Sequence, residues 1–160
     1  MTDEAETSEH ESGGAYGPYP EQRDWLLAQF VTWANVDGIT TAITMNTGGL
    51  TVSGYIISGK EYFEAIADLY KEQFPPNSQG AVRDAILNIG NSMYTEEQVR
   101  AQQAAGYPPT FIHLRDARIY SNSGGPLPAN TGVYWRGKID AVDGFWIGVL
   151  SQEPQRRVGG

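Results

Sequence analysis

Two histidines and a few aspartates are the residues of this chain with the most potential for acid–base chemistry. The histidines are His10, in a polar N-terminal segment, and His113. The aspartates that follow His113 are Asp116, Asp140 and Asp143. A Ser-His-Asp triad would have to use His113 as its base. Each aspartate, however, has an Arg, a Lys or a turn glycine nearby, which is typical of ion pairs and solvated turns.

The motifs that accompany enzyme active sites are missing from the sequence. The chain has no cysteine, which excludes thiolate catalysis and disulfides. No G-x-S-x-G elbow, H-x-x-x-H metal pattern or G-x-x-x-x-G-K-[ST] phosphate loop occurs. We therefore expect a protein that is not an enzyme and that needs no metal ion or other cofactor.

Aromatic and basic residues are concentrated in VYWRGKIDAVDGFWIG, residues 133–148. Its alternation predicts β-strands that turn Trp135 and Phe145 toward the core. The residues expected on the other face are Tyr134, Arg136, Lys138 and Trp146. Aromatic rings beside cations favour contacts with proteins, so we predict that these four residues form a protein-interaction surface.

The first half of the chain predicts a helix and then a β-hairpin. Residues 21–38, EQRDWLLAQFVTWANVDG, have apolar side chains at helical spacing and a glycine at the end. Trp25 and Trp33 are expected to anchor this helix in the core. The runs ITTAITMN and LTVSGYIIS then alternate with period two on either side of Gly48-Gly49, a strong hairpin signal.

A helical insertion is predicted at about residues 60–107, before further strands. In KEYFEAIADLYKEQF an apolar stripe predicts a core-facing helix. The stripe comprises Phe63, Ile66, Ala67, Tyr70 and Phe74. AVRDAILNI predicts a short helix, and TEEQ at 95–98 is a capping box that precedes another. FIHLRDARIYS then predicts a strand that bends at Arg115-Asp116.

These elements predict an α+β fold in which an N-terminal helix precedes a small, strongly bent antiparallel sheet or barrel, with the helical insertion between strands. We expect one domain over residues 21–152. Residues 1–20 contain five acids without Lys or Arg, which predicts a disordered acidic arm, and 153–160 predict a flexible tail.

Charge and hydropathy limit the partners. The net charge of −8 disfavours nucleic-acid phosphates and anionic membrane surfaces. No run approaches the roughly 20 apolar residues that a membrane span requires, and the N-terminus lacks a signal-peptide pattern. We expect a cytoplasmic protein without membrane insertion.

Three segments together resemble the gas vesicle protein U family of accessory proteins. They are LTVSGYIISGKEYFE, FIHLRDARIY and YWRGKIDAVDGFWIG. The resemblance implies a non-enzymatic protein that associates with gas vesicle shell proteins or with itself and promotes vesicle clustering. It brings no catalytic residues with it.

A second resemblance, at the level of the fold, is to Sm-like barrels. A helix, a hairpin, a bent strand and an Arg-Gly step, here Arg136-Gly137, follow in the same order. This resemblance implies RNA binding as the alternative function. Phe111, however, stands near the position of the asparagine that helps those proteins to bind RNA, and the acidic charge opposes binding.

Overall fold

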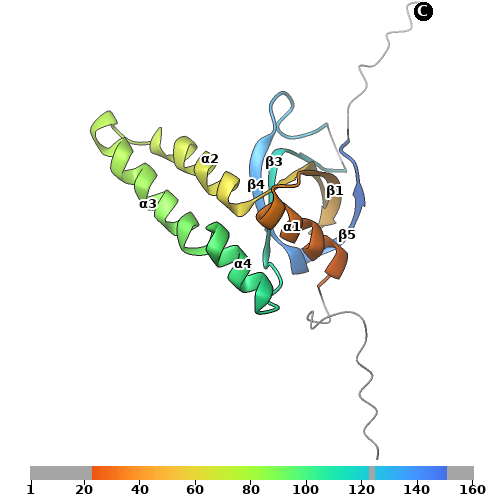
Figure 1. The fold of residues 1–160 in the computed structure, drawn as a ribbon. Coiled ribbons are helices and arrows are strands. Elements are labelled where there is room, and N and C mark those ends of the chain that lie inside the picture. The colour runs from red at the N-terminus through yellow and green to blue at the C-terminus, as the bar shows by residue number, and fades with distance from the viewer. Residues whose placement is uncertain (1–22, 123–124, 151–160) are drawn as a thin grey trace, which may run out of the picture.

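The computed structural model describes residues 23–122 and 125–150. The predicted acidic arm, 1–20, and the predicted tail, 153–160, therefore lie outside the described residues. Figure 1 shows a helix over a bent sheet, with a pair of long helices projecting from it. The helices are α1 (Trp25–Asp37), α2 (Gly59–Lys71), α3 (Pro76–Tyr94) and α4 (Glu96–Ala104). The strands are β1 (Thr41–Thr47), β2 (Leu50–Ile57), β3 (Phe111–Tyr120), β4 (Val133–Lys138) and β5 (Val142–Ile147).

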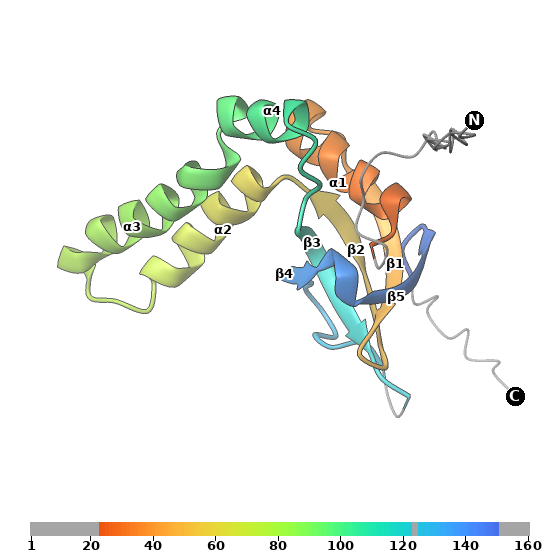
Figure 2. The same ribbon diagram turned by 90° about the horizontal axis from the view of Figure 1, so that it is seen from below.

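The expected α+β class is confirmed, and of the two alternatives, a bent sheet or a barrel, the structure has the open sheet. The strands form one antiparallel sheet in the order β4-β3-β2-β1-β5. The edge strands β4 and β5 are joined by a 3₁₀ turn, Ile139–Ala141, rather than by hydrogen bonds between them. Ile139 of this turn is buried in the core, and the sheet is bent without closing (Figure 2).

Local turn chemistry explains the hairpin and the bend, both of which were predicted. Gly48 and Gly49 have φ angles of 57° and 78°, which glycine adopts without steric cost. In β3, Asp116 has a φ of 48°, and the pairing register shifts here against both neighbouring strands. Such a bulge increases the twist of a strand, so β3 bends where Arg115-Asp116 was expected to bend it.

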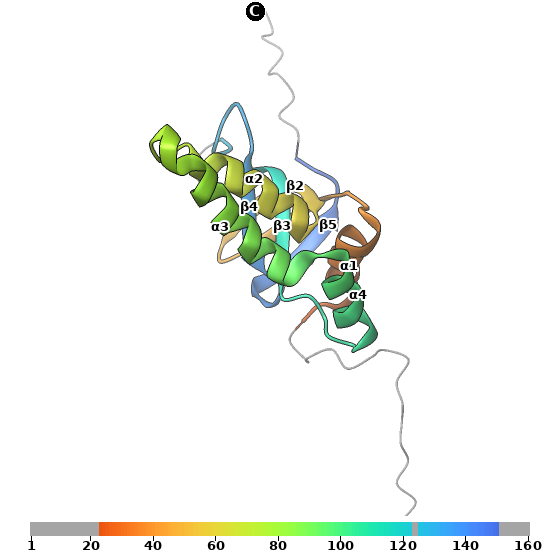
Figure 3. The same ribbon diagram turned by 60° about the vertical axis from the view of Figure 1, so that its left-hand side comes forward.

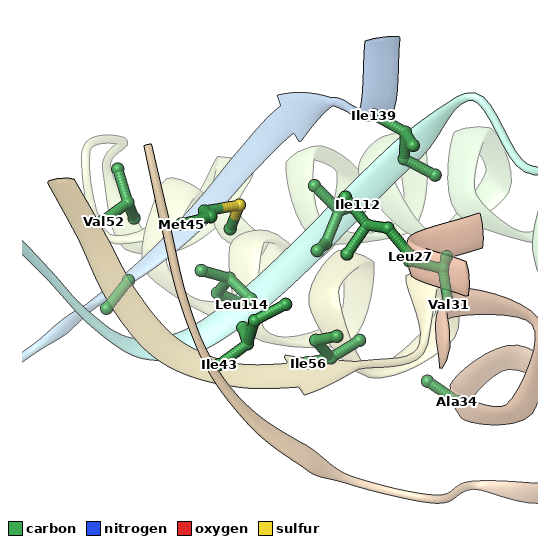
Figure 4. Packing of buried hydrophobic residues seen from close by; sticks show 11 residues of the cluster. Leu27, Val31, Ala34, Ile43, Met45, Val52, Ile56, Ile112, Leu114 and Ile139 are labelled. Carbon is green, nitrogen blue, oxygen red and sulfur yellow. The ribbon is translucent and has the colours of Figure 1, made fainter. Parts of the chain in front are cut away.

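The core lies between α1 and one face of the sheet (Figure 4). Asp24 caps the start of α1 by accepting a hydrogen bond from the Leu27 N–H, and Gly38 ends the helix at a φ of 68°. The helix side chains in the core are Leu27, Val31 and Ala34. Trp25 and Trp33 remain 48% and 39% exposed, so the expectation that they anchor the core is wrong.

The insertion between β2 and β3 consists of α2, α3 and α4, so the predicted helices between strands are confirmed. Ser58 caps α2, and Thr95 caps α4 through the Gln98 N–H. α2 and α3 form an antiparallel hairpin that projects from the sheet, while α4 returns beside α1 (Figure 3). No helix within 23–122 and 125–150 is both long and apolar enough to cross a membrane.

The apolar stripe of α2 has a different partner from the one predicted. Gly90 of α3 lies against Phe63, and Gly59 of α2 lies against Tyr94, so much of this stripe packs on the neighbouring helix. Ala67 is buried, but Tyr70 is 47% exposed. The expected core-facing helix is therefore one half of a helical hairpin.

Candidate interaction surface

The pairing of the strands places all four predicted surface residues on the face of the sheet opposite the core. On β4, Trp135 pairs with the core residue Leu114, so Tyr134, Arg136 and Lys138 point the other way. On β5, Trp146 pairs with Thr44, and Thr44 pairs with Ser53. Because Ser53 follows the core residue Val52 on β2, it points away from the core, and so does Trp146. The four side chains are all exposed.

The structure brings three of these residues together and separates the fourth. Tyr134, Arg136 and Lys138 alternate along β4 at one edge of the sheet. Trp146 lies on β5 at the opposite edge, with β3, β2 and β1 between them. The sequence therefore predicted the shared face but not this separation, because strand order cannot be read from alternation. The interaction role of the four residues stays a prediction.

Arg136 is held in place by aromatic rings. Its Cζ lies 3.7 Å from the centroid of the Phe111 ring and 5.9 Å from that of Phe63. Both distances suit cation–π attraction. None of the ion pairs among the described residues includes Arg136. The guanidinium of Arg136 therefore connects β4 with Phe111 of β3 and Phe63 of α2.

His113, the candidate base, lies below this arginine in an aromatic cluster. Its ring is fully buried, with centroids of Tyr62 at 4.6 Å and Tyr94 at 5.4 Å. Neither ring nitrogen has a hydrogen-bond partner within the described residues. Burial, assisted by the positive charge of Arg136, lowers the pKa of His113 from 6.5 to about 3. The imidazole is thus neutral near pH 7 and faces rings rather than a carboxylate.

The candidate carboxylates have other roles or positions. Asp116 accepts hydrogen bonds from the Gly132 N–H at 3.1 Å and from Arg118 at 3.2 Å, so it stabilises the bend of β3. Asp140 lies in the 3₁₀ turn and Asp143 on β5. Across 23–122 and 125–150, no group of three or more His, Cys, Asp or Glu side chains could hold a metal ion.

The structure also shows two features that sequence reasoning missed. Cavities of about 470 Å³ and 260 Å³ adjoin the segment before β3 and share Tyr107, Pro108 and Pro109 in their walls. The feature of the sequence that could have pointed to these cavities is the Tyr107-Pro108-Pro109 segment in their walls. The second feature is a set of exposed apolar side chains on the α2–α3 hairpin, including Leu69 and Ile89. Its sequence signal was the apolar residues of two consecutive predicted helices, of which only the first was predicted to face the core.

Comparison with known proteins gives one result. Residues 24–150 match the model of a protein family described as gas vesicle protein GvpU-like. No curated protein and no solved structure matches the chain. The match spans all the helices and strands described above, including the helical insertion.

Proposed function

Since the chain belongs to the gas vesicle protein GvpU-like family, we propose that it is a non-enzymatic accessory protein that binds gas vesicles or itself and gathers vesicles into clusters. The observation on which this proposal rests is the family match over residues 24–150. A gas vesicle-related protein follows from the match. The clustering activity and the self-association are the proposed part.

The exposed face of the sheet supports a role in protein contacts. It presents Tyr134 and Trp146, which are 37% and 45% exposed, together with the charges of Arg136 and Lys138. Aromatic and arginine side chains are enriched where proteins bind one another. The position of Arg136 on the Phe111 ring lowers the entropy lost on binding, because the guanidinium is already ordered.

The RNA-binding alternative has less support. Arg136, of the Arg-Gly step, is engaged with the rings of Phe111 and Phe63. A net charge of −8 opposes the approach of a phosphate backbone. If RNA were the partner, an oligouridine probe would shift at low salt and the shift would weaken steeply as salt increased.

A clustering assay with purified vesicles tests the proposed activity. The wild-type chain is expected to increase the light scattering of a vesicle suspension and to produce clusters visible by microscopy. The double variant Tyr134→Ser/Trp146→Ser should cluster vesicles less well, because it removes the exposed rings. Tyr107→Ser is the matched control, since Tyr107 is also exposed but lies elsewhere, at 71%. Unchanged scattering with the wild-type chain would contradict the proposed activity.

A further inference from the structure

One side of the α2–α3 hairpin is apolar and largely uncovered. We call it the overhang surface and define it by Ile66, Leu69, Val82, Ala85, Ile89 and Met93. Leu69, Ile89 and Met93 are 51%, 54% and 42% exposed, and Ala85 is exposed as well. Figure 2 shows the α2–α3 hairpin extending beyond the sheet, so no strand lies beside the hairpin for much of its length.

Two contacts show that the residues from both helices lie on the same side of the hairpin. On α2, Tyr62 packs on His113 of the sheet, and Ile66 and Leu69 follow it at helical spacings of four and three. On α3, Met93 lines a cavity with Phe111 at the start of β3. Ile89, Ala85 and Val82 precede Met93 at spacings of four, four and three. Both rows therefore begin beside the sheet and continue outward.

The α2–α3 hairpin buries little of its apolar surface within a single chain. α3 has 19 residues, of which only Gly90 is buried. Helices in proteins derive most of their stability from packing an apolar face, so a helix of this length normally packs on more than one neighbour. α3 contacts α2 and α4, and at its C-terminal end Tyr94 also packs on His113 of β3. The overhang surface is the apolar side that these contacts leave open.

Most of the charge on the hairpin lies away from the overhang surface, with Glu72 at its edge, three residues after Leu69. Asp68 pairs with Lys71 at 2.7 Å and with Arg83 at 2.8 Å, and Asp68 and Lys71 lie on the opposite side of α2 by helical spacing. The overhang surface contains no charged residue, and Gln73 and Ser78 beside it are also neutral. A second copy of a chain with net charge −8 is repelled across charged regions, whereas two neutral surfaces can meet.

We infer that the overhang surface binds the same surface of a second copy, so that two α2–α3 hairpins pack as a four-helix bundle. A two-fold axis makes one apolar patch its own partner, which an isologous dimer requires. Two helices about 10 Å apart and about 20–25 Å long cover roughly 400–500 Å² per copy. The total of roughly 800–1,000 Å² lies below the roughly 1,200 Å² at which stable specific interfaces begin, so the expected dimer is weak and reversible. This inference rests on the proposed self-association and assigns a surface to it.

Sedimentation velocity over a range of concentrations tests the inferred dimer. Ile89→Lys and Leu69→Lys each place a charge in the interface and should raise the dimer dissociation constant at least about tenfold. Asn91→Lys is the matched control, because it adds the same charge to the other side of α3. Both target side chains are about half exposed, so circular dichroism should show unchanged helix content. Equal dissociation constants for Ile89→Lys, Leu69→Lys and wild type would overturn the inference.

Site-directed cross-linking gives a second, independent readout. The chain has no cysteine, so Ile89→Cys and Asn91→Cys each introduce a single thiol. A short bis-maleimide should link Ile89→Cys into dimers and leave Asn91→Cys mostly monomeric. Equal yields from the two variants would count against the proposed packing.

The clustering assay separates this inference from the proposed function. A wild-type dimer that persists in both lysine variants overturns the inference, while self-association stands. A monomeric wild-type chain that still clusters vesicles overturns the inference alone. A monomeric chain that clusters no vesicles contradicts both.

Discussion

His113 is a buried histidine whose nitrogens lack partners, and its environment makes the stability of the fold depend on pH. The rings of Tyr62, Phe63 and Tyr94 surround it, and the positive charge of Arg136 adds to the effect of burial in lowering its pKa. Its pKa falls from 6.5 in the unfolded chain to about 3 in the fold. The unfolded chain therefore binds the proton more tightly, and protonation favours unfolding.

The first prediction concerns this histidine. Its contribution to stability is fully present above about pH 6.5 and decreases as the pH falls toward about 3. Between about pH 7 and about pH 5 the loss should be about 2 kcal/mol. The variant His113→Phe should lack this loss of stability, because it removes the imidazole and leaves the other titrating groups in place. Urea unfolding of the wild type and of His113→Phe at both pH values measures the difference. An equal pH dependence of the two free energies of unfolding would contradict the stated pKa.

At the scale of elements, Gly90 determines how closely α2 and α3 pack. A Cβ atom at Gly90 would stand 2.6 Å from the Phe63 Cβ, whose position is fixed by the backbone, and 2.8 Å from its Cγ. At Gly80 of the same helix, a Cβ atom would meet nothing within 4 Å. The two glycines thus differ in packing but share their helical conformation.

The second prediction compares these glycines. Gly90→Ala should lower the free energy of unfolding by about 1–2 kcal/mol, because the steric cost exceeds the gain in helix propensity. Gly80→Ala should raise it by about 0.5–1 kcal/mol, since only the propensity changes. Denaturant titration followed by circular dichroism measures both. Stabilisation by Gly90→Ala would show that the hairpin packs less closely than the structure describes.

Local sequence signals predicted most of the helices and strands, whereas the contacts between these elements depend on long-range packing. The hairpin at Gly48-Gly49 and the bend at Asp116 depend on positive φ angles within a few residues. The partner of the α2 stripe depends on α3, which is distant in sequence, so periodicity identified an apolar face without identifying what covers it. The same limit left the choice between an open sheet and a barrel undecided, and the sheet is open.

The candidate surface shows this limit as well. Alternation along the strands predicted that Tyr134, Arg136, Lys138 and Trp146 avoid the core face, since side-chain direction is a local property. The distance between β4 and β5 depends on the order of five strands, which no local pattern specifies.

At the scale of the whole molecule, the charge of −8 opposes association between copies. The third prediction is that moderate salt promotes assembly, because it screens this repulsion while apolar and cation–π contacts persist. Turbidity of the concentrated protein should increase from about 20 mM to about 300 mM NaCl, where the Debye length shortens to about 6 Å. A flat or falling turbidity would contradict this electrostatic account.

The central claim is that this chain acts on gas vesicles, and flotation tests it most directly. Purified vesicles rise through the solution, and a bound protein rises with them. The wild-type chain is expected in the floating layer, in an amount that saturates as more protein is added, while an unrelated acidic protein of similar size stays in the liquid below. Recovery of the chain entirely below the vesicles, at every ratio of protein to vesicle, would contradict the claim.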